Sequence, residues 1–255
     1  RPAGQSQNRF GRQPACRGYR DGRLGRFVEQ VELGAAGLNQ AGPGRDDAQE
    51  VDLAAAKLIL EPLEFRRADQ PPKENHMAVA LVTGITGQDG QHLAEFLHSQ
   101  GYHVFGMVKG QNNPRVEALQ HEMPFIELVS GDLADLPSIV SAMEACQPDE
   151  VYNLGAISFV ALSFSQAELT ANITGLGVLR MLEAVRMVGG SQNNPIRFYQ
   201  ASSSEMFGQV RETPQTELTP FHPRSPYGCA KVFGHDIVVN YRESYGLHAS
   251  SGILF

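Results

Sequence analysis

From Ala78 to the end of the chain, short runs of apolar residues alternate with longer amphipathic stretches. This alternation is typical of a parallel sheet with helices on both faces. Six strands are expected, at residues 78–84, 103–109, 125–132, 150–156, 197–203 and 248–255. Helices are expected at residues 91–100, 136–146, 167–189 and 227–245. The pattern therefore predicts an α/β fold in which residues 77–255 form one domain around a doubly wound parallel sheet.

The first 76 residues differ in composition, because Gly, Arg, Gln and Pro are frequent there and apolar residues form only short patches. A helix is expected only at residues 51–60. None of the seven methionines precedes Met77, which suggests that this segment is translated from upstream of the true start. We expect a disordered or non-native extension. A targeting arm is the alternative, and the many acidic residues of the segment disfavour it.

Composition narrows the class of protein. A hydrophobic content of 42% is enough for a real core, and the sequence has no apolar run of the roughly 18 residues that cross a bilayer. We therefore expect a cytoplasmic protein without a membrane partner. The three cysteines lack a CxxC or Cys/His cluster, so neither a disulfide framework nor a metal site is expected. Residues 77–255 are net acidic, which argues against a nucleic-acid partner.

A glycine-rich loop follows the first expected strand. The stretch "TGITGQDG" places Gly84, Gly87 and Gly90 at the opening of a helix. Glycines allow a tight turn and close backbone approach, so that the free N–H groups of the helix can hold a pyrophosphate. The spacing alone is weak evidence because turns are rich in glycine. Its place between a strand and a helix favours a dinucleotide site.

The end of the second strand bears on which dinucleotide binds. A site that prefers NAD usually has an acidic residue there, on the adenine ribose. The stretch "GMVKGQNNPR" has none, whereas Lys109 and Arg115 are cations that could meet a 2′-phosphate. NADP is therefore the expected cofactor. The alternative for Lys109 is a solvated surface side chain.

Two further loops follow the third and fourth strands. Ligands of such sheets lie outside the carboxyl ends of the strands, so these loops are expected beside the cofactor. The residues concerned are Asp132 and Leu133 after the third strand, and Leu154, Gly155, Ala156, Ile157 and Ser158 after the fourth.

The stretch "RSPYGCAK" supplies a candidate catalytic pair. Ser225 and Pro226 form a good N-cap and first helical residue, so Tyr227 and Lys231 share one face of the helix. A nearby ammonium favours tyrosinate, and we expect it to lower the pKa of the Tyr227 phenol. A packing tyrosine with an exposed lysine is the alternative, but the glycine loop upstream favours the catalytic interpretation.

The glycine loop together with Tyr-x-x-x-Lys resembles the extended short-chain dehydrogenase/reductases, which have a Rossmann fold. The stretches "YNLGAIS", "FYQASSSEMFG", "RSPYGCAK" and "VNYRESYGLHASSGILF" are similar to the GDP-mannose 4,6-dehydratase family. The resemblance covers residues 78–255. It implies that NADP is bound by the whole first loop as well as by Tyr227 and Lys231: Gly84, Ile85, Thr86, Gly87, Gln88, Asp89 and Gly90.

The resemblance also assigns roles after the fifth strand. Glu205 stands at the position of the base that removes the C5 proton of the sugar, and Ser203 stands where the family usually has a threonine that donates to the C4 oxygen. The implied substrate is GDP-mannose or a related sugar nucleotide, and the implied assembly is a homo-oligomer. Three departures bear on cofactor affinity: Phe159 replaces a usual His, Leu169 a usual Tyr, and the arginine pair after the second strand is missing.

The family's chain continues beyond this point into a smaller substrate domain, which is largely absent here. Because that domain selects the nucleotide, another sugar-nucleotide 4,6-dehydratase or a 4-epimerase is an alternative. A catalytically inactive nucleotide-binding fragment is a third.

Overall fold

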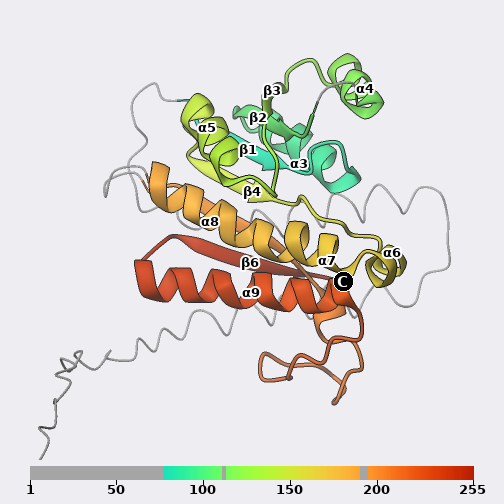
Figure 1. Cartoon of the computed structure of the whole chain (residues 1–255). Coiled ribbons are helices and arrows are strands. Elements are labelled where there is room, and N and C mark those ends of the chain that lie inside the picture. Colours follow the sequence, from blue (N-terminus) through green and yellow to red (C-terminus); the bar gives the residue numbers. More distant parts are fainter. Residues whose placement is uncertain (1–76, 111–112, 190–194) are drawn as a thin grey trace, which may run out of the picture. The chain divides into compact units, whose positions relative to one another are not determined.

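The computed structural model describes residues 77–110, 113–189 and 195–255. The predictions for residues 1–76, including the helix at 51–60, lie outside these ranges. Figure 1 shows the described residues as a sheet covered by helices.

All six strands belong to one parallel sheet with the order β3-β2-β1-β4-β5-β6. This order reverses between β1 and β4, which gives the doubly wound topology that the alternation predicts. The strands are β1 (Val79–Thr83), β2 (His103–Val108), β3 (Glu127–Ser130), β4 (Glu150–Asn153), β5 (Arg197–Ser203) and β6 (Ala249–Leu254).

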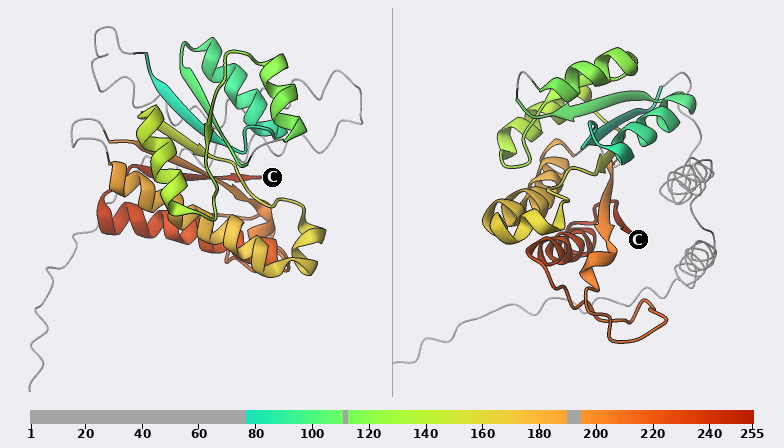
Figure 2. Two further views of the ribbon diagram at one scale, coloured as in Figure 1. Left: turned by 45° about the horizontal axis from the view of Figure 1, so that its top comes forward. Right: turned by 90° about the vertical axis from the view of Figure 1, so that its right-hand side faces the viewer.

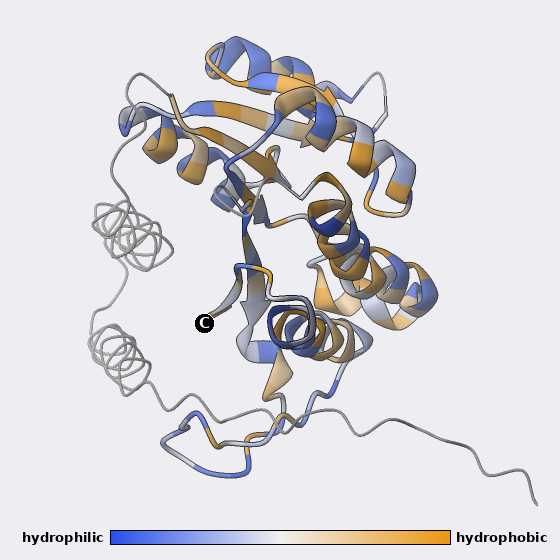
Figure 3. Ribbon diagram, turned by 90° about the vertical axis from the view of Figure 1, so that its left-hand side faces the viewer, coloured by the Kyte–Doolittle hydropathy of each residue, from blue (hydrophilic) through white to orange (hydrophobic). Residues whose placement is uncertain are grey.

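Helices cover both faces of the sheet, and each face has its own apolar cluster. On one face Leu81, Val151 and Phe198 pack against α5 (Leu136–Cys146), α8 (Leu176–Val188) and α9 (Pro226–Tyr245). On the other face the cluster joins strand residues to α3 (Gln88–Ser99) and α4 (Pro114–Glu122). Figure 2 shows α8 and α9 side by side, and Figure 3 shows hydrophobic and hydrophilic segments alternating along the helices. None of the helices in the described ranges is long and apolar enough to cross a membrane.

Three helical features depart from the sequence-based expectations. The short helices α4 and α6 (Val160–Ser165) were not predicted. Only Leu119 of α4 is buried, so the helix carries little amphipathic signal, although Asn113 caps it and Pro114 begins it. The expected helix at 167–189 is divided into α7 (Ala167–Thr170), a π-helical turn η2 (Ala171–Gly175) and α8. The π turn adds a residue to the helical path, which a regular hydrophobic period does not reveal.

Candidate functional site

The glycine loop between β1 and α3 is closely packed against the loop that follows β4. Gly84 has φ +71°, and a Cβ atom added to it would lie 2.9 Å from Leu154 C and Gly155 N. A Cβ on Gly90 would lie 2.4 Å from Gly84 O. α3 begins after Gly87, which provides no side-chain cap. The first N–H groups of α3 therefore lack a capping side chain and can donate to an anion such as a pyrophosphate.

The loop after β3 lies next to these two loops. The Leu133 side chain is close enough to Gly155 that a Cβ there would meet its Cδ1 at 3.0 Å. The predicted cofactor residues after β1, β3 and β4 are thus brought together. Ile85 contributes only its backbone to such a site, because its side chain is 1% exposed and packs in the core. The remaining predicted residues of these loops are partly or fully exposed: Thr86, Gln88, Asp89, Ala156, Ile157 and Ser158.

Lys109 follows β2 and forms an ion pair with Asp132, with Lys109 Nζ 2.8 Å from Asp132 Oδ2. The Lys109 side chain is 68% exposed. Partial burial by itself raises the pKa of the Asp132 carboxyl, but the hydrogen bonds from Lys109 and from the Ala134 N–H outweigh it and lower that pKa. The cation predicted for a 2′-phosphate is therefore already paired with a carboxylate that is also a predicted cofactor residue.

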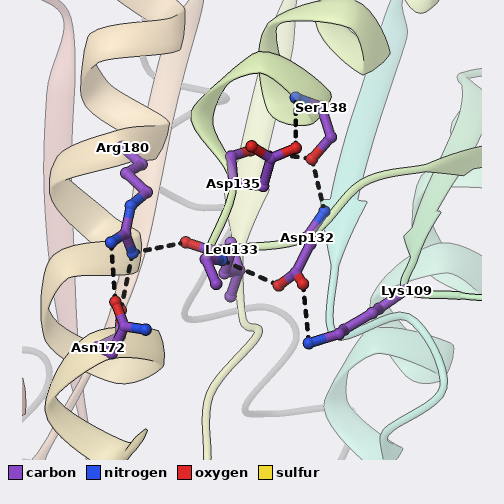
Figure 4. Close-up of polar contacts among 8 residues, drawn as sticks. Lys109, Asp132, Leu133, Asp135, Ser138, Asn172 and Arg180 are labelled. Carbon is purple, nitrogen blue, oxygen red and sulfur yellow. Dashed lines mark hydrogen bonds and ion pairs between the residues drawn. The ribbon is translucent and has the colours of Figure 1, made fainter. Parts of the chain in front are cut away.

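Arg180 in α8 is a residue at this site that sequence reasoning missed. Its guanidinium donates to Leu133 O at 2.9 Å, to Asn172 O at 3.0 Å and to Asn172 Oδ1 at 2.8 Å. Figure 4 shows Arg180 and Lys109 approaching the loop after β3 from opposite sides. In the same π turn as Asn172, the Thr174 hydroxyl accepts a hydrogen bond of 3.0 Å from the Ile157 N–H. The π turn therefore links Arg180 to the loop after β4.

Ser203 and Glu205 lie at the carboxyl end of β5, where the strand passes into the 3₁₀ turn η3 (Ser204–Met206). Ser203 caps this turn by accepting from the Glu205 N–H at 3.2 Å, and its hydroxyl also hydrogen-bonds to Tyr227. Glu205 lines a cavity of about 630 Å³ together with Ser204, Gly208, Gln209, Val210, Gln215, Arg224 and Phe255. Ser203 therefore serves both the turn and the phenol, whereas Ser204 and Glu205 line the cavity.

Tyr227 and Lys231 begin α9, as predicted, with Ser225 accepting from the Gly228 N–H at 3.0 Å. Both side chains are buried, at 7% and 5% exposed. Lys231 Nζ donates to Ala201 O at 2.8 Å and lies 5.6 Å from the centre of the Tyr227 ring. The lysine is thus held against β5 and the phenol against Ser203.

The pKa of Tyr227 corrects the prediction made from the spacing alone. Burial raises the pKa of the phenol, the hydrogen bond from Ser203 lowers it, and the carboxylates of Glu205 and Asp89 raise it further, so that the net direction is upward. Burial also lowers the pKa of Lys231 to about 8, against a smaller opposing effect of Asp89. Desolvation therefore outweighs the expected lysine effect on the phenol.

Among the described residues, no group of three or more His, Cys, Asp or Glu side chains could hold a metal ion.

Comparison with known proteins agrees with the sequence motifs. The family model described as GDP-mannose 4,6 dehydratase matches residues 81–255. The GDP-mannose 4,6-dehydratase of Vibrio cholerae is 49% identical over 69% of this chain and 49% of its own length. The human GDP-mannose 4,6 dehydratase is 50% identical over 69% of this chain and 49% of its own length.

Solved structures share the fold. Thermus thermophilus UDP-glucose 4-epimerase, crystallised with NAD, matches with a TM-score of 0.58 and 27% identity over 68% of this chain and 53% of its own. This chain spans about half the length of the curated relatives it matches. The family match, together with the glycine loop, the Tyr227–Lys231 pair and Glu205, shows that the chain belongs to the GDP-mannose 4,6-dehydratase family, within the extended short-chain dehydrogenase/reductases.

Proposed function

We propose that the whole protein converts GDP-mannose to GDP-4-keto-6-deoxymannose, with a nicotinamide cofactor that is regenerated in each turnover. The observation that carries this proposal is the position of Glu205. Glu205 lines the cavity at the carboxyl end of β5 and stands two residues after Ser203, which hydrogen-bonds to Tyr227. An elimination needs a second base beside the oxidation centre, whereas a simple epimerase or reductase needs none.

The cofactor fits the three loops at the carboxyl edge of the sheet. The glycine loop and the uncapped start of α3 would hold the pyrophosphate, and the loops after β3 and β4 would border the adenosine and nicotinamide halves. Lys231 would hold the nicotinamide ribose. The chemistry that a bound nicotinamide would supply is acceptance of hydride from C4 of the sugar and its return to C6. NADP is proposed over NAD because Lys109 follows β2 where an acidic residue would favour NAD.

The residues of the chain would act on the protons. Tyr227 takes the proton of the C4 hydroxyl, and Ser203 donates to the C4 oxygen as it becomes a carbonyl. That carbonyl acidifies the C5 proton, which Glu205 would remove and pass to the departing C6 hydroxyl, so that water leaves. C5 would take up a proton from solvent when hydride returns to C6. Because burial raises the pKa of Tyr227, the positive charge of an oxidised nicotinamide would favour ionisation of the phenol.

The test is Glu205→Gln in the full-length protein. The amide keeps the size of the side chain but cannot remove a proton, so elimination should slow by about 10² to 10⁴ while C4 oxidation persists. We expect transient NADPH absorbance without 4-keto-6-deoxy product, together with loss of solvent-deuterium exchange at C5. Glu243→Gln, on the exposed face of α9, is the matched control and should keep both signals. Normal product formation by Glu205→Gln would remove Glu205 from the mechanism and leave the proposed reaction without the observation that carries it.

A 4-epimerase is the second candidate function, because the epimerase of Thermus thermophilus has the same sheet and lies at 27% identity. A 4-epimerase exchanges no proton at C5, so the deuterium measurement separates the two reactions. Under either function we propose residues 77–255 as the nicotinamide-binding domain and a homo-oligomer as the assembly, which sedimentation of the full-length protein would test.

A further inference from the structure

A buried chain of side-chain hydrogen bonds crosses three neighbouring strands and ends at the proposed catalytic lysine. The Thr83 hydroxyl on β1 donates to Asn153 Oδ1 on β4 at 2.7 Å. Asn153 Nδ2 donates to Gln200 Oε1 on β5 at 2.7 Å, and Gln200 Nε2 donates to Ala201 O at 2.8 Å. Lys231 Nζ donates to the same oxygen. The three strand side chains are 1–2% exposed.

The strand register explains why these side chains meet. Thr83 pairs with Asn153, and Asn153 pairs with Gln200, so the three residues stand at one level across adjacent strands. All three are polar residues at positions where buried parallel strands usually carry apolar ones. Every side-chain oxygen and nitrogen atom of the three residues has a hydrogen-bond partner, and the Gly155 N–H donates to the Thr83 hydroxyl at 2.9 Å.

The Ala201 carbonyl lies beyond the last pair of the ladder between β4 and β5. The Arg197 N–H donates to Asp149 O beside β4, and peptide groups alternate in direction along a strand, so the Ala201 carbonyl faces the β4 side as well. β4 ends at Asn153, whose pair is Gln200. The carbonyl is therefore left to the two side-chain donors, one from Gln200 and one from Lys231.

From this arrangement we propose that Gln200 is a positioning residue for Lys231. Its amide holds the Ala201 carbonyl in the orientation that accepts the lysine ammonium, and Asn153 and Thr83 hold the amide from the neighbouring strands. Gln200 touches neither cofactor nor sugar in this proposal. The inference rests on the proposed function for the importance of Lys231 in turnover, but the contact between Gln200 and Lys231 can be tested without activity.

The charge of Lys231 provides that test. The ammonium is buried, and Ala201 O is its acceptor on β5. Asp89 in α3 favours the charged form of Lys231. The uncharged Tyr227 ring lies near Lys231 on α9, and Glu205 in η3 raises the pKa of the Tyr227 phenol. If the carbonyl turns away, the ammonium loses its acceptor and the pKa of Lys231 should fall.

The variant is Gln200→Met, which keeps the side-chain length and removes the amide. The chain contains only four lysines, Lys57, Lys73, Lys109 and Lys231, so ¹³Cε-lysine NMR can follow each through a pH titration. We expect the pKa of Lys231 to fall by about one unit, the effect of losing one hydrogen bond to a charged group. In the full-length enzyme kcat should fall about tenfold or more, with KM for the sugar nucleotide changed less than threefold.

Ser202→Ala is the matched control. Ser202 is also buried on β5, and its hydroxyl pairs with His235 Nδ1 on α9 at 3.1 Å, one helical turn beyond Lys231. Its loss should lower stability by a similar amount without moving the pKa of Lys231. Should Gln200→Met not fold, Asn153→Ser removes the support of the amide and should lower the pKa in the same direction by less.

Three results would overturn the proposal. An unchanged pKa of Lys231 in Gln200→Met would make the amide a structural group only. A raised pKa would mean that Gln200 competes with Lys231 for the carbonyl. An equal fall in Ser202→Ala would assign the effect to general loosening of β5. If the pKa of Lys231 falls in Gln200→Met but the wild-type protein does not turn over the sugar nucleotide, the positioning role stands and the proposed function is rejected.

Discussion

The two lysines of the candidate site lie at opposite ends of it and are held in opposite ways. Lys231 is 5% exposed, donates to a backbone carbonyl and has a pKa lowered to about 8 by burial. Lys109 is 68% exposed and is paired with Asp132. The β5–α9 end therefore holds a desolvated charge in one geometry, whereas the β2–β3 end holds a solvated charge that can exchange partners.

This difference indicates how the two ends contribute. Groups that act on reacting atoms need fixed positions and shifted pKa values, and burial provides both at a cost in stability. A cation that meets a phosphate at the periphery of a cofactor contributes mainly affinity and selectivity, and an exposed ion pair contributes little to stability. Substitutions at the β5–α9 end should therefore change rates, and those at the β2–β3 end should change binding modestly.

The largest effect is expected for Tyr227→Phe at the buried end. Removal of the hydroxyl deletes the proposed base, so C4 oxidation in the full-length protein should slow by about 10² to 10⁴. Cofactor affinity, measured by nucleotide fluorescence titration, should change little because Lys231 is retained. Tyr245→Phe, at the exposed end of the same helix, is the control. A wild-type rate of hydride transfer in Tyr227→Phe would remove this residue from the mechanism.

Gly84→Ala should weaken cofactor binding by at least about tenfold, because the new methyl group meets the loop after β4 at 2.9 Å in addition to the strain at φ +71°. Gly101→Ala separates these two effects. Gly101 has a similar φ of +80°, but a Cβ there meets nothing within 4 Å. Gly101→Ala should lose about 1 kcal/mol of stability and keep the wild-type affinity for the cofactor. Equal affinities of the two variants would show that the loop contact does not matter.

Lys231→Met should raise the free energy of unfolding at pH 7 by about 1–3 kcal/mol, since the lysine pKa falls from 10.5 to about 8 on folding. Between these values the unfolded state binds more protons than the folded state. As the pH rises from about 8 to 10.5, loss of the Lys231 proton therefore increases the free energy of unfolding of the wild type. The difference in stability between the wild type and the variant should shrink over this range. Denaturant titrations of the wild type and the variant at pH 7 and 9.5 measure this.

Lys109→Ala should have the smallest effect, a loss of preference for NADP over NAD of about threefold to tenfold without a change in stability beyond about 0.5 kcal/mol. The difference should diminish in high salt because the side chain is exposed. Asp132→Asn tests the pairing from the other side, because releasing the cation should strengthen NADP binding. Equal NADP affinity in wild type and Lys109→Ala would identify Lys109 as a surface residue only.

Local sequence was sufficient for much of this site. The strand at 197–203 and the helix at 136–146 match the structure, since each is defined by its own run of residues. The start of α9 was predictable because Ser225 and Pro226 act on the backbone within one turn. The glycine loop was recognisable for the same reason.

Other features depend on residues that lie far apart in the chain. Thr83 and Asn153 are separated by 70 residues, Asn153 and Gln200 by 47, and Leu133 and Arg180 by 47. A polar residue in an apolar strand signals that a partner is needed, but only the order of the strands determines which one. The prediction that the pKa of Tyr227 is lowered was wrong for a related reason. The spacing of the residues shows only the neighbouring lysine, whereas desolvation of the phenol depends on every residue that packs around it.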